Sequence, residues 1–387
     1  MGIKDLLSGI KKAHPQVIHT DVKLITFKGC KLTVDIPIYA WKYMAIARKD
    51  AIKYIDPTVQ DPDPAMIESF WLEKYFLLGM TFIECGITPI MVFDGPAFRL
   101  KQDTQDDRKG TTEERREKIR HMRKQLLEEP DGVTADKMKE NIASELEYLI
   151  TFTSENWEKL ERMLRTMGVP VLVGPYEAEA VCARLVRYGY ASGVVTNDGD
   201  ALPHGATIMI RDVKRLMRGK NPQHKCECII LKDVLNVMEL SMSEFIDFCM
   251  LLGTDYNTRV KRHGFITGFK NFKKHKTMEK TLKNAKDDDH TLHDVKIREE
   301  IKGYFTNDFP DAIPDHPLIV FYENGLTSCF EDIFSNFYRI RMVEKASGYI
   351  ETLLNFNQNF ASMQNFILID EKDVNINLKK IGGGEES

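Results

Sequence analysis

Three short apolar segments of this chain lead into an aspartate. Segments of this kind are typical of buried strands in a parallel sheet, and open α/β sheets bind their ligands beyond the carboxyl ends of such strands. The sequence therefore predicts a parallel sheet with acidic side chains along one edge. The segments are 31–34 before Asp35, 89–93 before Asp94 and 192–197 before Asp198.

Four further acids extend this set: two follow another apolar segment, and two lie after Asp198 in the chain. So many carboxylates repel one another unless a positive charge lies among them. Because carboxylate oxygens are ligands that hard divalent cations prefer, we expect Mg²⁺, or Mn²⁺ as a substitute, at this edge. The four acids are Glu177, Glu179, Asp200 and Asp255.

Length and composition narrow the class of protein. The 387 residues allow one large or two modest domains, and a hydrophobic fraction of 43% supports a sizeable core. No apolar run reaches the ~18 residues of a membrane span, and the N-terminus lacks the apolar region of a signal peptide. Seven scattered cysteines suit a reducing compartment. We therefore expect an intracellular protein without a membrane segment.

Cys226 and Cys228 lie close to His224, a grouping that hints at zinc. No second ligand pair follows at metal spacing. We therefore expect a strand with two ordinary thiols at this position.

The net charge of −4 argues against a nucleic-acid partner, but the average conceals local asymmetry. Residues 259–286 contain ten Lys or Arg and one acid, and residues 108–125 contain eight Lys or Arg and three acids. A charged run is most often a solvated face. Two basic stretches that flank an acidic cluster are better explained as a track for a phosphate backbone.

The pattern along the chain alternates strands with helices. Such alternation predicts a parallel sheet covered by helices on both faces. Residues 99–153 are charged and helix-prone, which indicates a helical insertion, and the chain is helical and basic from 256 onward. Helices are expected at 38–47, 64–85, 154–167, 177–188 and 241–253, and a strand at 169–173.

Six short motifs occur in order along the chain. Together they resemble the structure-specific 5′-nucleases of the flap endonuclease superfamily, over roughly residues 1–285. The motifs are Met-Gly-Ile-Lys-x-Leu at the N-terminus, Val-Asp35, Val-Phe-Asp94-Gly, Pro-Tyr-Glu177-Ala-Glu179-Ala, Asp198-x-Asp200 and Leu-Leu-Gly-Thr-Asp255-Tyr.

The resemblance implies an α/β fold with a PIN-like core, whose central, mostly parallel sheet is covered by helices. The core is expected at 1–255, with a helical arch inserted at about 99–153. A basic helix–turn–helix region is expected at 256–317, followed by a C-terminal extension of unassigned role at 318–387.

The resemblance also implies two metal sites. Two ions about 4 Å apart can activate a water and stabilise the leaving oxygen in a phosphodiester displacement. Taken alone, an acid such as Glu177 is equally explained by its place at the start of a helix. The implied ligands, direct or through water, are Asp35, Asp94, Glu177 and Glu179 for one ion, and Glu179, Asp198, Asp200 and Asp255 for the other.

Four further positions acquire roles from the resemblance. Lys101 and Arg108 match a basic pair at the base of the arch that would grip the scissile phosphate and offset charge in the transition state. Trp41 matches an aromatic position on which a base stacks, although a Trp on a helix is equally well explained by packing in the core. Gly2 matches a glycine that lies near the metals.

The chain departs from the family pattern after Asp255. Relatives have a Gly-x-Gly hairpin that binds duplex phosphates and K⁺ through its backbone, whereas here Arg262 replaces the first glycine and Gly264 remains. A position that requires φ > 0 would be strained by this arginine. We expect duplex DNA to bind there and along Lys273, Lys274 and Lys276. The replaced glycine argues against K⁺ binding. A sliding-clamp docking motif of the usual form is absent from the sequence.

These observations predict a Mg²⁺-dependent, monomeric nuclease that cuts branched or nicked DNA near a 5′ single-stranded flap. It would act in DNA replication and repair, in the nucleus or in a viral or cellular replication compartment. A 5′→3′ exonuclease or a junction resolvase of the same superfamily is the alternative, and the helical insertion favours threading of a free 5′ end. A non-catalytic DNA-binding replication factor has no need of so many converging acids. RNA as a substrate stays open.

Overall fold

The computed structural model describes residues 2–95, 103–128, 132–218, 221–285, 287, 290–306, 349 and 352–353, with the backbone alone for 103–111 and 218. A seven-stranded sheet forms the centre, in the order β1-β9-β6-β5-β2-β3-β4. Strands β4, β3, β2, β5 and β6 are parallel, while β9 is antiparallel to both of its neighbours. The strands are β1 Ile18–Lys23, β2 Lys31–Asp35, β3 Thr88–Phe93, β4 Val171–Val173, β5 Gly193–Val195, β6 Ile208–Lys214 and β9 Lys225–Ile230, beside a small hairpin of β7 Met217–Arg218 and β8 Asn221–Pro222. The α/β fold with a mostly parallel sheet is therefore confirmed.

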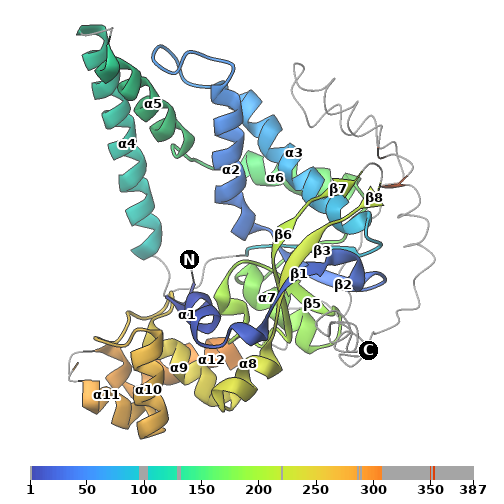
Figure 1. The fold of residues 1–387 in the computed structure, drawn as a ribbon, viewed down its shortest axis with the longest axis vertical. Coiled ribbons are helices and arrows are strands. Elements are labelled where there is room, and N and C mark those ends of the chain that lie inside the picture. Colours follow the sequence, from blue (N-terminus) through green and yellow to red (C-terminus); the bar gives the residue numbers. More distant parts are fainter. Residues whose placement is uncertain are drawn as a thin grey trace, which may run out of the picture.

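Helices cover the sheet and extend beyond it (Figure 1). Their ends follow local rules: Thr153 and Ser241 form capping boxes, and Asp63 accepts a hydrogen bond from the amide of Ala65 at 3.0 Å. The helices are α1 Leu6–Ala13, α2 Pro37–Ile52, α3 Pro64–Ile83, α4 Asp103–Glu128, α5 Val133–Glu147, α6 Ser154–Thr166, α7 Ala178–Arg187, α8 Leu231–Met238, α9 Met242–Leu252, α10 Phe265–His275, α11 Met278–Ala285 and α12 Val295–Thr306. The expected helices are all present, and α2 is longer than its sequence pattern predicts.

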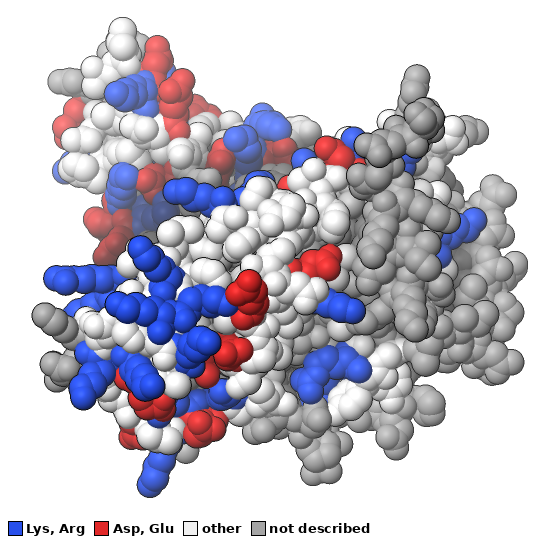
Figure 2. Space-filling view, turned by 60° about the horizontal axis from the view of Figure 1, so that its bottom comes forward, with Lys and Arg blue, Asp and Glu red and all other residues white. Residues whose placement is uncertain are grey.

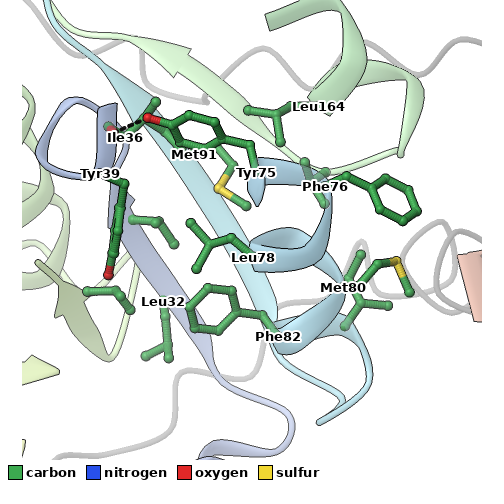
Figure 3. Packing of buried hydrophobic residues seen from close by; sticks show 14 of the residues in the cluster. Leu32, Ile36, Tyr39, Tyr75, Phe76, Leu78, Met80, Phe82, Met91 and Leu164 are labelled. Atoms are coloured by element: carbon green, nitrogen blue, oxygen red, sulfur yellow. Dashed lines mark hydrogen bonds between the residues drawn. The ribbon is translucent and has the colours of Figure 1, made fainter. Parts of the chain in front are cut away.

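Helix α3 forms the centre of the main core. It has buried residues around its whole circumference, as expected for a helix enclosed between the sheet and other helices. Figure 3 shows Tyr75, Leu78 and Phe82 of α3 against Leu32 of β2 and Met91 of β3. The hydroxyl of Tyr75 donates to the carbonyl of Ile36 at 2.9 Å, directly after Asp35. This packing fixes the carboxyl end of β2.

The insertion after β3 contains a pair of helices, α4 and α5, which project from the body of the molecule (Figure 1). They share a small apolar core that includes Ile119 and Ile142. Arg123 of α4 donates to the carbonyl oxygens of Pro57 and Gln60, at 2.8 and 2.9 Å, in the loop between α2 and α3. The helical insertion predicted from the sequence is present, and it is attached to α2 and α3 at one side.

The strand expected around Cys226 is β9. The two thiol sulfurs lie 3.8 Å apart, and His224 Nε2 lies 2.8 Å from Glu84 Oε2. His224 Nδ1 accepts a hydrogen bond from the amide of Leu216 at 3.0 Å. Both ring nitrogens of His224 therefore contact Leu216 and Glu84 rather than the thiols.

Across the parts of the chain that the structure covers, none of the helices is both long and apolar enough to cross a membrane. The C-terminal extension from 318 lies outside the described residues, apart from Tyr349, Thr352 and Leu353. Leu353 is fully buried in the main core, and Tyr349 packs edge to face on Phe76 of α3. A short part of the extension thus contacts the main core.

Candidate metal centre at the sheet edge

Three adjacent parallel strands deliver one aspartate each to the same edge of the sheet. Asp35 is the last residue of β2, Asp94 follows β3 directly, and Asp198 follows β5 by three residues. β2 pairs with β3 on one side and with β5 on the other. Because the strands are parallel, their carboxyl ends coincide, as the sequence predicts.

Asp35 is almost wholly buried, with 2% of its surface exposed. Its Oδ2 accepts a hydrogen bond from Thr196 Oγ1 at 2.7 Å, and its Oδ1 accepts one from the amide of Ile38 at 3.4 Å. Burial raises the pKa of Asp35 to about 7; Thr196 opposes this shift, and the charges of Asp94 and Asp198 add to it.

Asp198 is the N-cap of a 3₁₀ turn, Gly199–Ala201, and Asp200 lies within this turn. Asp198 Oδ1 accepts from the amide of Asp200 at 3.1 Å, and Asp200 Oδ1 accepts from the amide of Ile3 at 2.6 Å. Burial raises the pKa of both carboxyls, and repulsion from Asp255 contributes to each shift. The N-terminal segment is thereby joined to the acidic edge.

Gly2 occupies a position at which any side chain would be strained. Its φ is +78°, and a Cβ at this position would lie 1.8 Å from Asp198 Oδ1 and 2.6 Å from Asp200 Oδ1. Glycine is required both by the backbone conformation and by this close approach. Gly2 thus lies beside Asp198 and Asp200, where the resemblance places it.

Glu177 and Glu179 lie at the start of α7, where Glu177 is the N-cap residue. Asp94 Oδ1 accepts from the amide of Ala178 at 2.8 Å, which joins β3 to the same helix end. Glu177 Oε2 accepts from two hydroxyls, Tyr256 at 2.5 Å and Tyr304 at 2.8 Å. Asp94 and Glu177 therefore both lie at the N-terminus of α7, where the positive end of the helix dipole favours negative charge.

The donor set fits a hard divalent cation by its chemistry. It consists of carboxylates, and the pKa values of Asp35, Asp198 and Asp200 are raised by burial and by neighbouring negative charge, which a cation would offset. Among the residues described, no group of three or more His, Cys, Asp or Glu side chains is arranged to hold a metal ion as it stands. Five of the carboxylates instead accept hydrogen bonds from amides or hydroxyls: Asp35, Asp94, Glu177, Asp198 and Asp200.

The other sequence-predicted residues fall into different environments. Lys101 lies outside the described residues, and Arg108 belongs to the part of α4 for which the backbone alone is described. Trp41 is half-buried and packs edge to face on Phe152, with ring centroids 5.5 Å apart. Trp41 therefore packs against the main core.

The hairpin that departs from the family pattern has the predicted backbone strain. Arg262 has a φ of +60°, in the left-handed region, while Gly264 has a φ of −71° and begins α10 as its N-cap. Lys273 donates to Glu239 Oε2 at 2.9 Å and to the carbonyl of Met238 at 3.3 Å, at the C-terminal end of α8. Lys273 thus has a structural partner that the sequence did not indicate.

Exposed basic side chains surround this hairpin and the two helices that follow it. Figure 2 shows Lys and Arg gathered at the left of the view, over this helical part of the molecule. We call this surface the basic face. Its exposed members are Lys261, Arg262, Lys270, Lys274, Lys276, Lys280 and Lys283.

Sequence reasoning missed three side chains that organise the acids. Thr196 and Tyr256 lie within the segments that were recognised, but only the fold shows their hydroxyls facing Asp35 and Glu177. Tyr304 lies 127 residues from Glu177 in the chain, and its local sequence gives no signal of this contact.

Two regions of the chain match known domains. The XPG N-terminal domain matches residues 1–117, which include Asp35 and Asp94. The XPG I-region matches residues 168–255, which run from just before β4, through α7, to Asp255. All seven candidate ligands lie within these two matches.

The chain belongs to the XPG and flap endonuclease family of nucleases. Flap endonuclease 1 of Mycosarcoma maydis is 30% identical over 292 residues, which cover 74% of this chain and 71% of the relative. Other relatives are longer: the chain spans 62% of the length of flap endonuclease 1 from Cryptosporidium muris and 47% of that from Plasmodium falciparum.

Solved structures share the fold. Flap endonuclease-1 from Methanococcus jannaschii superimposes with a TM-score of 0.56 at 23% identity, over 88% of this chain and 96% of that one. Human GEN1 in complex with Holliday junction DNA gives a TM-score of 0.56 at 15% identity, over 95% of this chain and 81% of that one. At these identities the likeness establishes the fold and no finer property.

Proposed function

We propose that this protein is a Mg²⁺-dependent nuclease that cleaves DNA phosphodiester bonds beside a 5′ single-stranded flap. The observation behind the proposal is the convergence of Asp35, Asp94 and Asp198 on one sheet edge, with Glu177 at the adjoining helix end. Supporting evidence comes from the relatives, several of which are flap endonucleases by name.

The seven acids would hold two divalent ions. When bound, such ions supply a nucleophilic water at neutral pH and stabilise charge on the leaving oxygen. The protein's own part is to fix the carboxylates. Thr196 holds Asp35, the amide of Ile3 holds Asp200, and the N-terminus of α7 holds Asp94. The proposed ligands are Asp35, Asp94, Glu177, Glu179, Asp198, Asp200 and Asp255.

Duplex DNA would bind along the basic face. Arg262 is exposed at the start of α10, where the helix dipole also favours a phosphate, and Lys274 and Lys276 are exposed at its other end. Replacing Lys274 and Lys276 with alanine is expected to weaken duplex binding for every sequence. The slope of log affinity against log salt should become less steep by roughly one unit per lost phosphate contact. An unchanged slope would mean that these lysines only solvate the surface.

The helical insertion would select substrates that have a free 5′ end. Lys101 and Arg108 lie at its start in the chain, and we propose that they reach the scissile phosphate once a strand has passed through. Blocking the 5′ end of a flap with a bulky protein before the enzyme is added should then suppress cleavage far more than blocking it afterwards. Equal rates for blocked and free flaps would favour the junction-resolving alternative, whose fold this chain shares equally well.

The test of the proposal is a panel of end-labelled DNA substrates: a 5′ flap, a nick, a gap and a four-way junction, each with and without Mg²⁺. We expect cleavage near the flap junction in Mg²⁺ and none in EDTA. Preferential cutting of the four-way junction would assign the chain to a junction resolvase. Absence of cleavage on every substrate, with tight DNA binding, would support the non-catalytic alternative.

A further inference from the structure

Helix α12 lies beyond the two matched domains, which end at Asp255, yet it contacts the acidic edge. The hydroxyl of Tyr304, near the end of α12, donates to Glu177 Oε2 at 2.8 Å. Tyr256 donates to the same oxygen at 2.5 Å, and the two tyrosine rings meet edge to face, with centroids 4.6 Å apart. A helix of the basic region thus reaches a candidate ligand of the core.

Both hydroxyls donate to a single oxygen of Glu177. Hydrogen bonds of this length from a hydroxyl to a carboxylate oxygen are the strong kind. With Oε2 held from two directions, the plane of the carboxylate and the direction of Oε1 are fixed. Only 7% of Glu177 and 3% of Tyr304 are exposed, so water is largely excluded from these bonds.

Tyr304 is itself held in place by its surroundings. Its ring lies 5.2 Å from His204, whose amide donates to the carbonyl of Asp200 at 3.2 Å. Two residues earlier in α12, Lys302 forms an ion pair with Asp247 of α9 at 2.9 Å. Helix α12 is therefore attached both to the loop after Asp200 and to α9.

We propose that Tyr304 is a positioning residue: together with Tyr256 it holds the Glu177 carboxylate in the orientation that a divalent cation requires. This inference rests on the proposed function, because it assumes that Glu177 serves a metal ion. Groups that orient a metal ligand typically contribute about 10- to 100-fold in metal affinity or activity. The tyrosines would act through Glu177 and touch neither the ion nor the substrate.

The test removes one hydroxyl at a time and measures metal binding directly. Tyr304→Phe and Tyr256→Phe retain both rings, and Mn²⁺ binding to the full chain is measured by isothermal titration calorimetry without DNA. We expect each change to raise the Kd for Mn²⁺ about 10-fold, and the double change to raise it further. DNA affinity in EDTA should be unchanged, and the cleavage rate should recover as Mg²⁺ is raised.

Two controls separate the hydroxyl from the packing of the ring. Tyr190→Phe removes a hydroxyl from a side chain that is 37% exposed, and it should leave the Kd unchanged. Phe305→Leu disturbs the same aromatic cluster, which Phe305 joins through His204 and Tyr304, while it keeps both hydroxyls on Glu177. A much smaller change in Kd for Phe305→Leu than for Tyr304→Phe supports the positioning role.

Three results would overturn the inference. Tyr304→Phe could bind Mn²⁺ as tightly as the wild type and merely melt at a lower temperature, or Phe305→Leu could raise the Kd as much as Tyr304→Phe. Either result, in a wild type that cleaves flaps, removes the positioning role and leaves the proposed function intact. A wild type that neither binds Mn²⁺ nor cleaves in Mg²⁺ removes both.

Discussion

Thr196 and Asp35 are joined by a hydrogen bond of 2.7 Å from the threonine hydroxyl to the carboxylate. The same hydroxyl oxygen accepts from the amide of Asp198 at 3.0 Å. Thr196 is fully buried, directly after β5, and Asp35 ends the neighbouring strand β2. One threonine therefore sets the position of an acid from each strand. It also opposes, through its hydrogen bond, the rise in the pKa of Asp35 that burial causes.

The buried charge of Asp35 predicts a dependence of stability on pH. Burial, with repulsion from Asp94 and Asp198, raises the pKa of Asp35 to about 7, above its ordinary value of 3.8. Because the folded state binds this proton more tightly than the unfolded state, the contribution of Asp35 favours folding at low pH and is lost as pH rises through 7. Without metal, Asp35→Asn should therefore raise the free energy of unfolding at pH 8 by about 1–3 kcal/mol.

Urea unfolding in EDTA, at pH 5 and pH 8, measures this effect. The advantage of Asp35→Asn should shrink on acidification, when the wild-type carboxyl takes up its proton. Thr33→Ser, a change at a buried threonine of the same strand, should show no such dependence on pH. An Asp35→Asn protein that is less stable than the wild type at pH 8 would contradict the role assigned to the buried charge.

Arg262 combines a strained backbone with an exposed charge, so stability and binding should change in opposite directions. Its φ is +60°, and a left-handed conformation costs an ordinary residue roughly 1–2 kcal/mol. Arg262→Gly should raise the free energy of unfolding by about 1 kcal/mol and weaken duplex binding. The slope of log affinity against log salt should become less steep by about one unit.

Arg262→Asn separates the two effects, because asparagine removes the charge and tolerates the left-handed region better than most residues. It should bind DNA as weakly as Arg262→Gly and gain less stability. If Arg262→Gly binds duplex as well as the wild type at every salt concentration, the arginine contributes no phosphate contact.

Away from the acidic edge, Arg215 and Glu84 form an ion pair. We expect its loss to lower the free energy of unfolding. Arg215 donates to both carboxylate oxygens of Glu84, at 2.6 and 2.8 Å, and to the hydroxyl of Tyr349 at 2.9 Å. Only 9% of the Glu84 side chain is exposed, so Arg215→Met would leave a largely buried carboxylate without the partner that contacts both of its oxygens. We expect a loss of about 2–4 kcal/mol in the free energy of unfolding.

The exposed pair of Lys53 and Asp50 is the matched control, because 63% of the Lys53 side chain is exposed. Lys53→Met should leave the free energy of unfolding almost unchanged, because exposed ion pairs contribute little. Tyr349→Phe, which removes only the hydroxyl that Arg215 contacts, should fall between the two, at about 1 kcal/mol. Equal losses for Arg215→Met and Lys53→Met, measured by urea unfolding, would show that burial adds nothing to the first pair.

The predictable parts of this molecule are those specified by neighbouring residues. Apolar segments that end in acids predict the edge formed by β2, β3 and β5, and the capping box at Ser241 predicts the start of α9. The strain at Arg262 follows from the replaced glycine alone. In each of these cases a short stretch of chain contains both the signal and the structure.

The contacts that escaped prediction join distant parts of the chain. Tyr304 meets Glu177 across 127 residues, and Arg215 meets Glu84 across 131 residues. Lys273 binds the end of α8 instead of pointing into solvent, although its sequence context is that of its exposed neighbours. No periodicity or local motif specifies such pairs, because they depend on how the helices pack.

The most direct measurement of the central claim compares the single-turnover cleavage rate of a 5′ flap by the wild type and by Asp198→Asn, in Mg²⁺ and in EDTA. Asp233→Asn, at the start of α8, is the control. We predict cleavage by the wild type and by Asp233→Asn in Mg²⁺ only, and a rate for Asp198→Asn that is lower by about 10²-fold or more, with flap binding retained. Cleavage in EDTA, or near-normal cleavage by Asp198→Asn, would contradict metal-dependent catalysis at the acidic edge.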